Sequence, residues 1–144
     1  MFTTRPEILG TFGVVTSTHW LASAAGMSLL ERGGNAFDAC AASAFVLQVV
    51  EPHLVGPAGE VPAVFYSART GQVEVLCGQG TTPAAATLER YRAEGLKLIP
   101  GNGLLATVIP GAFDAWMLLL RDHGTMRVRD VLEPAIYYAE HGHA

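Results

Sequence analysis

The chain has 144 residues, of which 50% are hydrophobic and 15% are charged, so it can build a core and disorder is not expected. Its formal net charge is -4 and its nine lysines and arginines are scattered, which argues against a nucleic-acid interface. An apolar fraction this high predicts either a well-covered core or an apolar surface that meets another subunit or a missing part of the chain.

The two cysteines, Cys40 and Cys77, stand in no spacing typical of a zinc site or a disulfide framework. We therefore expect no metal and no cofactor, with Cys40 a small core residue and Cys77 a weak nucleophile candidate at a strand end. The first residues, MFTTRPEILG, contain no basic-then-apolar leader, so a cytoplasmic location is expected. The most apolar run, Ala36 to Val50, is too short and too polar to span a membrane.

The first predicted element is a short strand over Thr11 to Ser17, which is rich in β-branched residues. The spacing of apolar residues then predicts a helix over Leu21 to Arg32, ended by Gly33 and Gly34. Hydroxyl groups at positions 16–18 are placed to cap the start of this helix.

A second helix is predicted over Ala36 to Val50, because Asn35 can cap it and Asp38 lies three residues on, as in a capping box. This helix is apolar nearly all round, so it should be central and covered on several sides. It ends at Glu51, because the residue before Pro52 is disfavoured in the α region.

A β-hairpin is predicted next, since VPAVFYSA and QVEVLC flank Arg69-Thr70-Gly71. The segment LLATVIP, further along, is also strand-like. The chain up to this point mixes strands and helices, which indicates an α/β or α+β fold.

The C-terminal half is predicted to be rich in helices. A short helix should start at about Thr87, and a longer one should start at Pro110 and end at Gly124. Val128 to His141 has helical periodicity, but Pro134 predicts two helical pieces that meet there. We take residues 1–144 as a single domain that is incomplete, because the chain stops directly after a helical pattern.

Several residues that suggest chemistry are explained better by a structural role than by a catalytic or binding role. Gly101 to Ala106, GNGLLA, lacks the preceding strand and following helix of a dinucleotide site. His19 follows hydroxyl residues, but no acid lies near it in the sequence to orient it for catalysis. Glu51 and Glu60 bracket a Gly/Pro loop that fixes no geometry between them. His53 in the same loop could be a general base. The alternative is that its imidazole forms hydrogen bonds with free backbone groups at the end of the preceding helix.

The stretch CGQGTTP, starting at Cys77, follows the hairpin and is the most informative turn. Gly78 and Gly80 flank a single amide, Gln79, on a loop that allows close approach. A chain that only reverses direction does not need such an arrangement, so Gln79 is a candidate for contact with a ligand. The alternative is that its amide only satisfies the turn.

Four stretches of this sequence together resemble the start of the large subunit of the γ-glutamyltransferase family. They are the STHWLAS segment, GGNAFDA, EPH, and the run LEPAIYYAEHG near the C-terminus. The resemblance covers nearly the whole chain from about Gly10, and GGNAFDA with EPH is fairly specific. It implies part of an αββα N-terminal-nucleophile hydrolase sandwich, made as a precursor that cuts itself.

In that family the nucleophile is a threonine at the start of a downstream small subunit, with its own amino group as base. The resemblance therefore implies no catalytic residue in this chain, which should be inactive alone. Its implied partners are the rest of the large subunit, the small subunit and a small amide substrate. A homo-oligomer is conceivable, and neither nucleic acid nor membrane is implied.

This sequence departs from the family pattern at two places. Pro57, Ala58 and Glu60 replace glycines after EPH, and Gln79 matches the family's arginine that holds the substrate α-carboxylate. Losing that charge-assisted pair costs roughly 1.5–3 kcal/mol. The predicted substrate is therefore a small amide other than glutathione, such as oxamate or a cephalosporin side chain.

Gln79 is the predicted substrate-binding residue, with Gly78, Gly80 and His53 as further candidates. The alternatives are a true γ-glutamyl transferase or glutathione hydrolase, and a non-catalytic binding domain derived from the large subunit.

Overall fold

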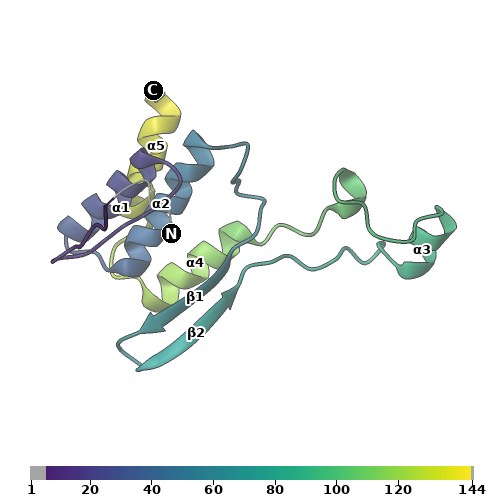
Figure 1. Cartoon of the computed structure of the whole chain (residues 1–144), viewed down its shortest axis with the longest axis horizontal. Helices are drawn as coiled ribbons and strands as arrows, with labels where there is room; N and C mark the ends of the chain where they lie inside the picture. Colours follow the sequence, from purple (N-terminus) through teal and green to yellow (C-terminus); the bar gives the residue numbers. More distant parts are fainter. Residues whose placement is uncertain (1–5, 144) are drawn as a thin grey trace. The chain divides into compact units, whose positions relative to one another are not determined.

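The computed structural model describes residues 6–143, which form an α+β structure of helices and one antiparallel hairpin. By contacts the chain divides into two compact units. The first comprises the chain up to Gly56 and from Leu118 onward, and the second comprises Pro57–Met117. The elements, labelled in Figure 1 where space allows, are α1 (Trp20–Glu31), α2 (Ala36–Val50), β1 (Pro62–Ser67), β2 (Gln72–Cys77), α3 (Leu88–Ala93), the 3-10 turn η1 (Leu104–Ala106), α4 (Ala112–His123) and α5 (Val128–His141).

Helix α1 lies where the sequence predicts it, but its cap differs. His19 occupies the N-cap position, and its Nδ1 accepts a hydrogen bond from the backbone N–H of Leu21 at 3.2 Å. The Ser17 hydroxyl instead donates to the backbone oxygen of His19 at 2.7 Å. The prediction that hydroxyls cap this helix was wrong, because the hydroxyls of Ser17 and Thr18 donate to the His19 carbonyl and to Glu51 instead.

The strand predicted over residues 11–17 does not form. This segment is extended but belongs to no sheet among residues 6–143. Instead it lies along α1, where a Cβ on Gly26 would be only 2.9 Å from a methyl carbon of Val15. A strand needs a neighbouring backbone to complete its ladder, and a helix cannot supply one.

Helix α2 has the predicted bounds and the predicted capping box. Asn35 Oδ1 accepts from the N–H groups of Phe37 and Asp38, and an Asp38 carboxylate oxygen accepts from the N–H of Asn35 at 2.9 Å. The Asn35 amide also donates to the carbonyl oxygen of His123 at 2.6 Å. The cap therefore starts α2 and at the same time ties it to the end of α4.

Alanines let α2 pack against both α1 and α5, which lie beside it in Figure 1. The hydroxyl of Ser43 on α2 donates to the carbonyl oxygen of Ala22 on α1 at 2.9 Å. As the sequence predicts, most of α2 is buried. Cys40 is exposed, however, so its prediction as a core residue was wrong.

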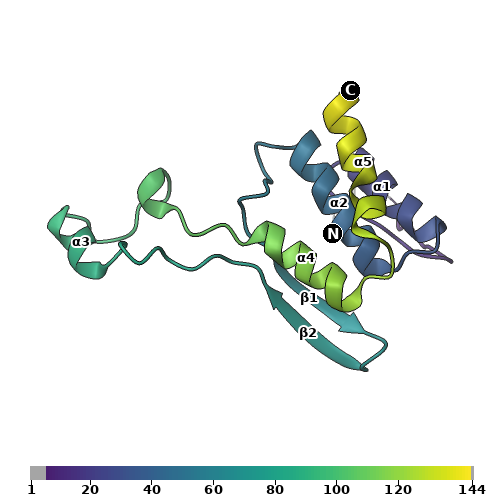
Figure 2. The same ribbon diagram turned by 180° about the vertical axis from the view of Figure 1, so that it is seen from behind.

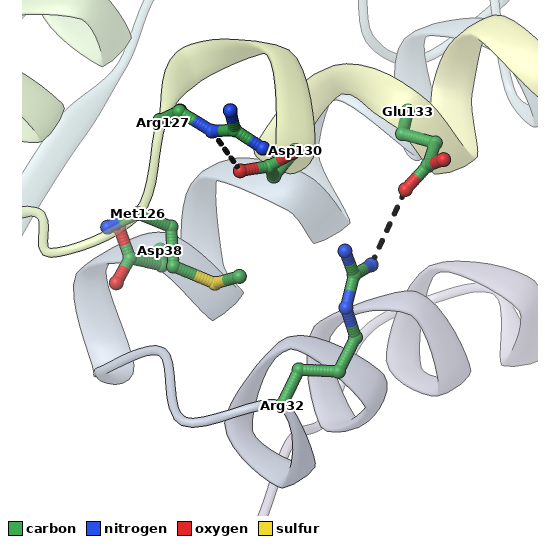
Figure 3. A network of polar contacts seen from close by, with 6 residues as sticks. All are labelled: Arg32, Asp38, Met126, Arg127, Asp130 and Glu133. Carbon is green, nitrogen blue, oxygen red and sulfur yellow. Dashed lines mark hydrogen bonds and ion pairs between the residues drawn. The ribbon is translucent and has the colours of Figure 1, made fainter.

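Asp38 is completely buried and holds the loop between α4 and α5 (Figure 3). Its carboxylate accepts from the backbone N–H of Thr125 at 3.1 Å, from the Thr125 hydroxyl at 2.6 Å and from the N–H of Met126 at 3.2 Å. With the bond from Asn35, these donors surround the carboxylate. A buried carboxylate is stable only when hydrogen bonds replace its lost water, and this site meets that requirement.

Helix α5 is continuous through Pro134, so the prediction of two helical pieces was wrong. Proline removes one backbone donor and crowds the preceding turn. Val131 and Ala135, one turn apart, are both buried where α5 packs against α2. Their packing outweighs the missing bond. Two ion pairs of α5, Arg127–Asp130 and Arg32–Glu133, are drawn in Figure 3.

The second unit is built on the predicted hairpin, seen from behind in Figure 2. Its strands pair antiparallel, and Gly71 has the positive φ of 67° that a tight turn requires. The pairing continues past the strands, because Val61 and Gly78 exchange two backbone hydrogen bonds of 3.2 and 2.8 Å. One face of the hairpin is entirely exposed and mostly apolar; it comprises Pro62, Val64, Tyr66, Val73, Val75 and Cys77.

Residues 81–110 leave the hairpin, carry α3 and η1, and return to the start of α4 (Figures 1 and 2). Helix α3 begins directly after Thr87, as predicted, and the Thr87 hydroxyl caps it by accepting from the N–H of Arg90. The strand predicted for LLATVIP is wrong, because its first three residues form η1 and the rest is irregular. Gly103, with a φ of 84°, turns the chain just before η1. Within residues 6–143, no helix has both the length and the apolar character to cross a membrane.

Replacing Asp38 by alanine should destabilise the protein by about 3 kcal/mol, because three backbone N–H groups would lose a buried acceptor. Urea unfolding of the purified protein measures this loss. Glu133→Ala is the control; it removes an exposed carboxylate and should cost less than about 1 kcal/mol. Equal losses for the two variants would contradict the role given to Asp38.

Candidate functional site

Gln79 lies in the turn that directly follows β2, where three segments of the second unit meet. Gly78 pairs with Val61, and the carbonyl oxygen of Thr81 accepts from the N–H of Ile109 at 3.0 Å. Gly78 and Thr81 bracket Gln79, so hydrogen bonds fix the backbone on both sides of it. The turn is therefore held in one conformation.

Glycine is required in this turn because the backbones come so close. A Cβ on Gly80 would lie 1.4 Å from the carbonyl oxygen of Ile109, and one on Gly78 would lie 2.4 Å from the Cβ of Ala115. No side chain fits at either distance. Gly78 and Gly80 thus position the turn, and nothing in the geometry makes them ligands themselves.

The start of α4 is joined to the loop before β1. The carbonyl oxygen of Gly59 accepts from the N–H groups of Gly111 and Ala112, at 3.3 and 3.1 Å. These first donors of the helix would otherwise attract an anion. Because Gly59 occupies them, they do not offer an anion site beside Gln79.

The side chain of Gln79 is exposed and contacts Glu60. Its amide Nε2 donates to Glu60 Oε2 at 3.1 Å, and its Oε1 lies 3.9 Å from the sulfur of Cys77. The opposite orientation of the amide would set two acceptors against each other, so the carboxylate fixes which way Gln79 points. The candidate site therefore consists of Gln79 on the glycine-built turn and Glu60 in the loop before β1.

The other predicted site residue, His53, is exposed in the turn that follows α2 and belongs to the first unit. Within the second unit, the structure groups Gln79 with Gly78, Gly80 and Glu60. Among residues 6–143, no cluster of three His, Cys, Asp or Glu side chains could hold a metal ion. A hollow of about 260 Å³ lies elsewhere in the second unit, beside Tyr91.

The sequence reasoning missed the pairing of Glu60 with Gln79, because these residues are 19 positions apart. The sequence presents Glu51 and Glu60 as neighbouring carboxylates, but Glu51 instead accepts a hydrogen bond from the Thr18 hydroxyl in the first unit. One signal was present: Glu60 and Gln79 are both departures from the family pattern. Two departures that lie on either side of one hairpin are candidates for contact.

The chain belongs to the gamma-glutamyltranspeptidase family, whose model matches residues 22–144. It is 39% identical to the glutathione hydrolase-like YwrD proenzyme of Bacillus subtilis, over 94% of this chain and 26% of that protein. It is 37% identical to the acylase ACY 1 proenzyme of a Pseudomonas strain, over 92% of this chain and 25% of that protein. An oxamate amidohydrolase proenzyme of Klebsiella pneumoniae is 31% identical, over 93% of this chain and 26% of that protein.

Solved structures agree with this assignment. A protein named LmbA2991HD superposes with a TM-score of 0.90 and 64% identity, covering 100% of this chain and 25% of that one. The gamma-glutamyltranspeptidase of Helicobacter pylori gives a TM-score of 0.86 and 33% identity, covering 96% of this chain and 40% of that one. The chain spans about a quarter of the length of the curated relatives it matches.

Replacing Gly80 by alanine should destabilise the protein by about 3 kcal/mol, because the new methyl group cannot fit beside Ile109. Urea unfolding measures the loss. Gly101→Ala is the matched control in the same unit, since a Cβ there meets nothing within 4 Å. It should change stability by less than about 1 kcal/mol. If Gly80→Ala were equally mild, the turn would not be fixed as described.

Proposed function

We propose that this chain is part of an amide hydrolase or acyltransferase that acts on a small amide other than glutathione. The observation that carries the proposal is Gln79, an exposed amide on a fixed turn, at the position where the resemblance implies a carboxylate-binding arginine. A neutral amide cannot replace the paired donors and charge of a guanidinium. A γ-glutamyl donor would therefore lose its main anchor.

The contact of Gln79 with Glu60 helps to choose between the two substrates that the sequence suggests, oxamate and a cephalosporin side chain. Oxamate is itself an anion, and the carboxylate of Glu60 would repel it from Gln79. An acyl group without a negative charge at this position fits better. The oxamate amidohydrolase among the relatives is therefore a poor guide to the substrate.

We further propose that catalysis needs a threonine nucleophile outside this chain and that the chain alone is inactive. The relatives named above are proenzymes, which supports self-cleavage of the full-length protein. In this mechanism the amino group released by cleavage serves as the base for the threonine hydroxyl. Preorganised donors would stabilise the tetrahedral intermediate.

The exposed face of the β1–β2 hairpin supports the proposal that further protein covers this chain. Val64 pairs with Val75 and Tyr66 pairs with Val73 on this face, and each side chain is at least 62% exposed. A contiguous apolar surface of this kind is typical of an interface. The rest of the large subunit and the small subunit are the proposed partners, and the relatives' greater length leaves room for both.

Self-cleavage can be tested by measuring intact masses of the protein expressed from the full reading frame. We expect two chains, the smaller beginning with threonine. A single uncleaved species without amidase activity would refute the proposed function and favour a non-catalytic binding domain.

The role of Gln79 can be tested by restoring the charge. In the full-length protein, Gln79→Arg combined with Glu60→Gln should raise kcat/KM for γ-glutamyl-4-nitroanilide by about tenfold, the effect of one charge-assisted pair. Gln79→Arg alone should gain less, because Glu60 would pair with the new guanidinium. Gln72→Arg adds the same charge at the start of β2 and should gain nothing. High wild-type activity on this substrate would instead indicate a true γ-glutamyl transferase.

A further inference from the structure

Glu60 and Gln79 present mainly hydrogen-bond acceptors to a ligand. The contact between Gln79 Nε2 and Glu60 Oε2 uses one of the two amide hydrogens of Gln79. The second carboxylate oxygen of Glu60 is left to accept hydrogen bonds, and the amide oxygen of Gln79, to which the Cys77 thiol donates at 3.9 Å, keeps one further lone pair. A group that donates hydrogen bonds therefore suits this pair better than one that accepts them.

The pair also carries an uncompensated negative charge. Within residues 6–143, no lysine, arginine or histidine forms an ion pair with Glu60, and its single hydrogen-bond partner is the neutral Gln79. Both side chains are exposed, so a ligand can reach them. An ammonium group would supply the missing charge and the missing donors together.

Both side chains project from backbone that is fixed by neighbours. Glu60 lies between Gly59, which binds the first N–H groups of α4, and Val61, which pairs with Gly78. Gln79 lies between Gly78 and the close contact of Gly80 with Ile109. A ligand would thus meet two groups that are already in place, which lowers the entropy cost of binding.

We propose that Glu60 is a specificity-determining residue, which together with Gln79 selects an acyl group that carries an ammonium or another hydrogen-bond donor in place of a carboxylate. This inference rests on the proposed function, since it assigns the substrate class of the same site. It also adds a residue to that site. The substrate is then a small amide whose acyl chain is cationic or rich in donors.

Binding to the full-length protein tests this inference without requiring catalysis. Calorimetry should compare three amides of similar size: 4-aminobutanamide, which is cationic, butanamide, which is neutral, and glutaramate, which is anionic. We expect 4-aminobutanamide to bind at least about fivefold more tightly than glutaramate. This ratio corresponds to the interaction energy of one ion pair that is partly exposed to solvent. The preference should shrink at high salt.

Glu60→Gln should remove most of this preference, chiefly by weakening the binding of 4-aminobutanamide. Glu89→Gln is the matched control, because it deletes the charge of an exposed glutamate on α3 in the same unit. It should keep the preference. Tighter binding of glutaramate, or an equal preference in Glu60→Gln, would overturn the inference.

The two proposals can fail separately. A protein that prefers 4-aminobutanamide through Glu60 but neither cuts itself nor hydrolyses amides would refute the proposed function alone. A self-cleaving amidase that prefers glutaramate would refute the inference alone.

Discussion

The buried carboxylate of Asp38 is the interaction on which the first unit depends. It accepts hydrogen bonds from three backbone N–H groups and one hydroxyl, and so joins the start of α2 to the loop before α5. Gly34 and Gly124 must lie close to it, since a Cβ on either would approach Asp38 within 3.3 Å. The stretch GGNAFDA therefore has a structural explanation: it builds a helix start around a buried acid.

The second unit depends on a steric constraint instead. Its backbone segments approach so closely at Gly78 and Gly80 that side chains are excluded, and the turn between them projects Gln79. The same contacts hold Glu60 beside it. A family scaffold with a fixed turn can change its ligand by changing side chains alone, because the backbone that positions them is determined elsewhere. We propose that Gln79 and Glu60 are such a change.

Local chemistry accounts for most of what the sequence predicts correctly. The capping box of Asn35, the hairpin turn at Gly71 and the start of α3 at Thr87 each depend on residues within a few positions. The failures depend on partners far along the chain. Residues 11–17 lie along a helix instead of pairing with a strand, and packing against α2 keeps α5 continuous through its proline. The contact of Glu60 with Gln79 is also non-local, so sequence reasoning found only half of the site.

The central claim is that Glu60 and Gln79 together recognise a group that donates hydrogen bonds. The most direct test is a crystal structure of the full-length protein with 4-aminobutanamide bound. The account predicts the ligand ammonium at about 2.7–2.9 Å from a carboxylate oxygen of Glu60, the usual length of a charge-assisted hydrogen bond, and within reach of the amide oxygen of Gln79. An ammonium group bound elsewhere in the protein, with no contact to Glu60 or Gln79, would contradict this claim.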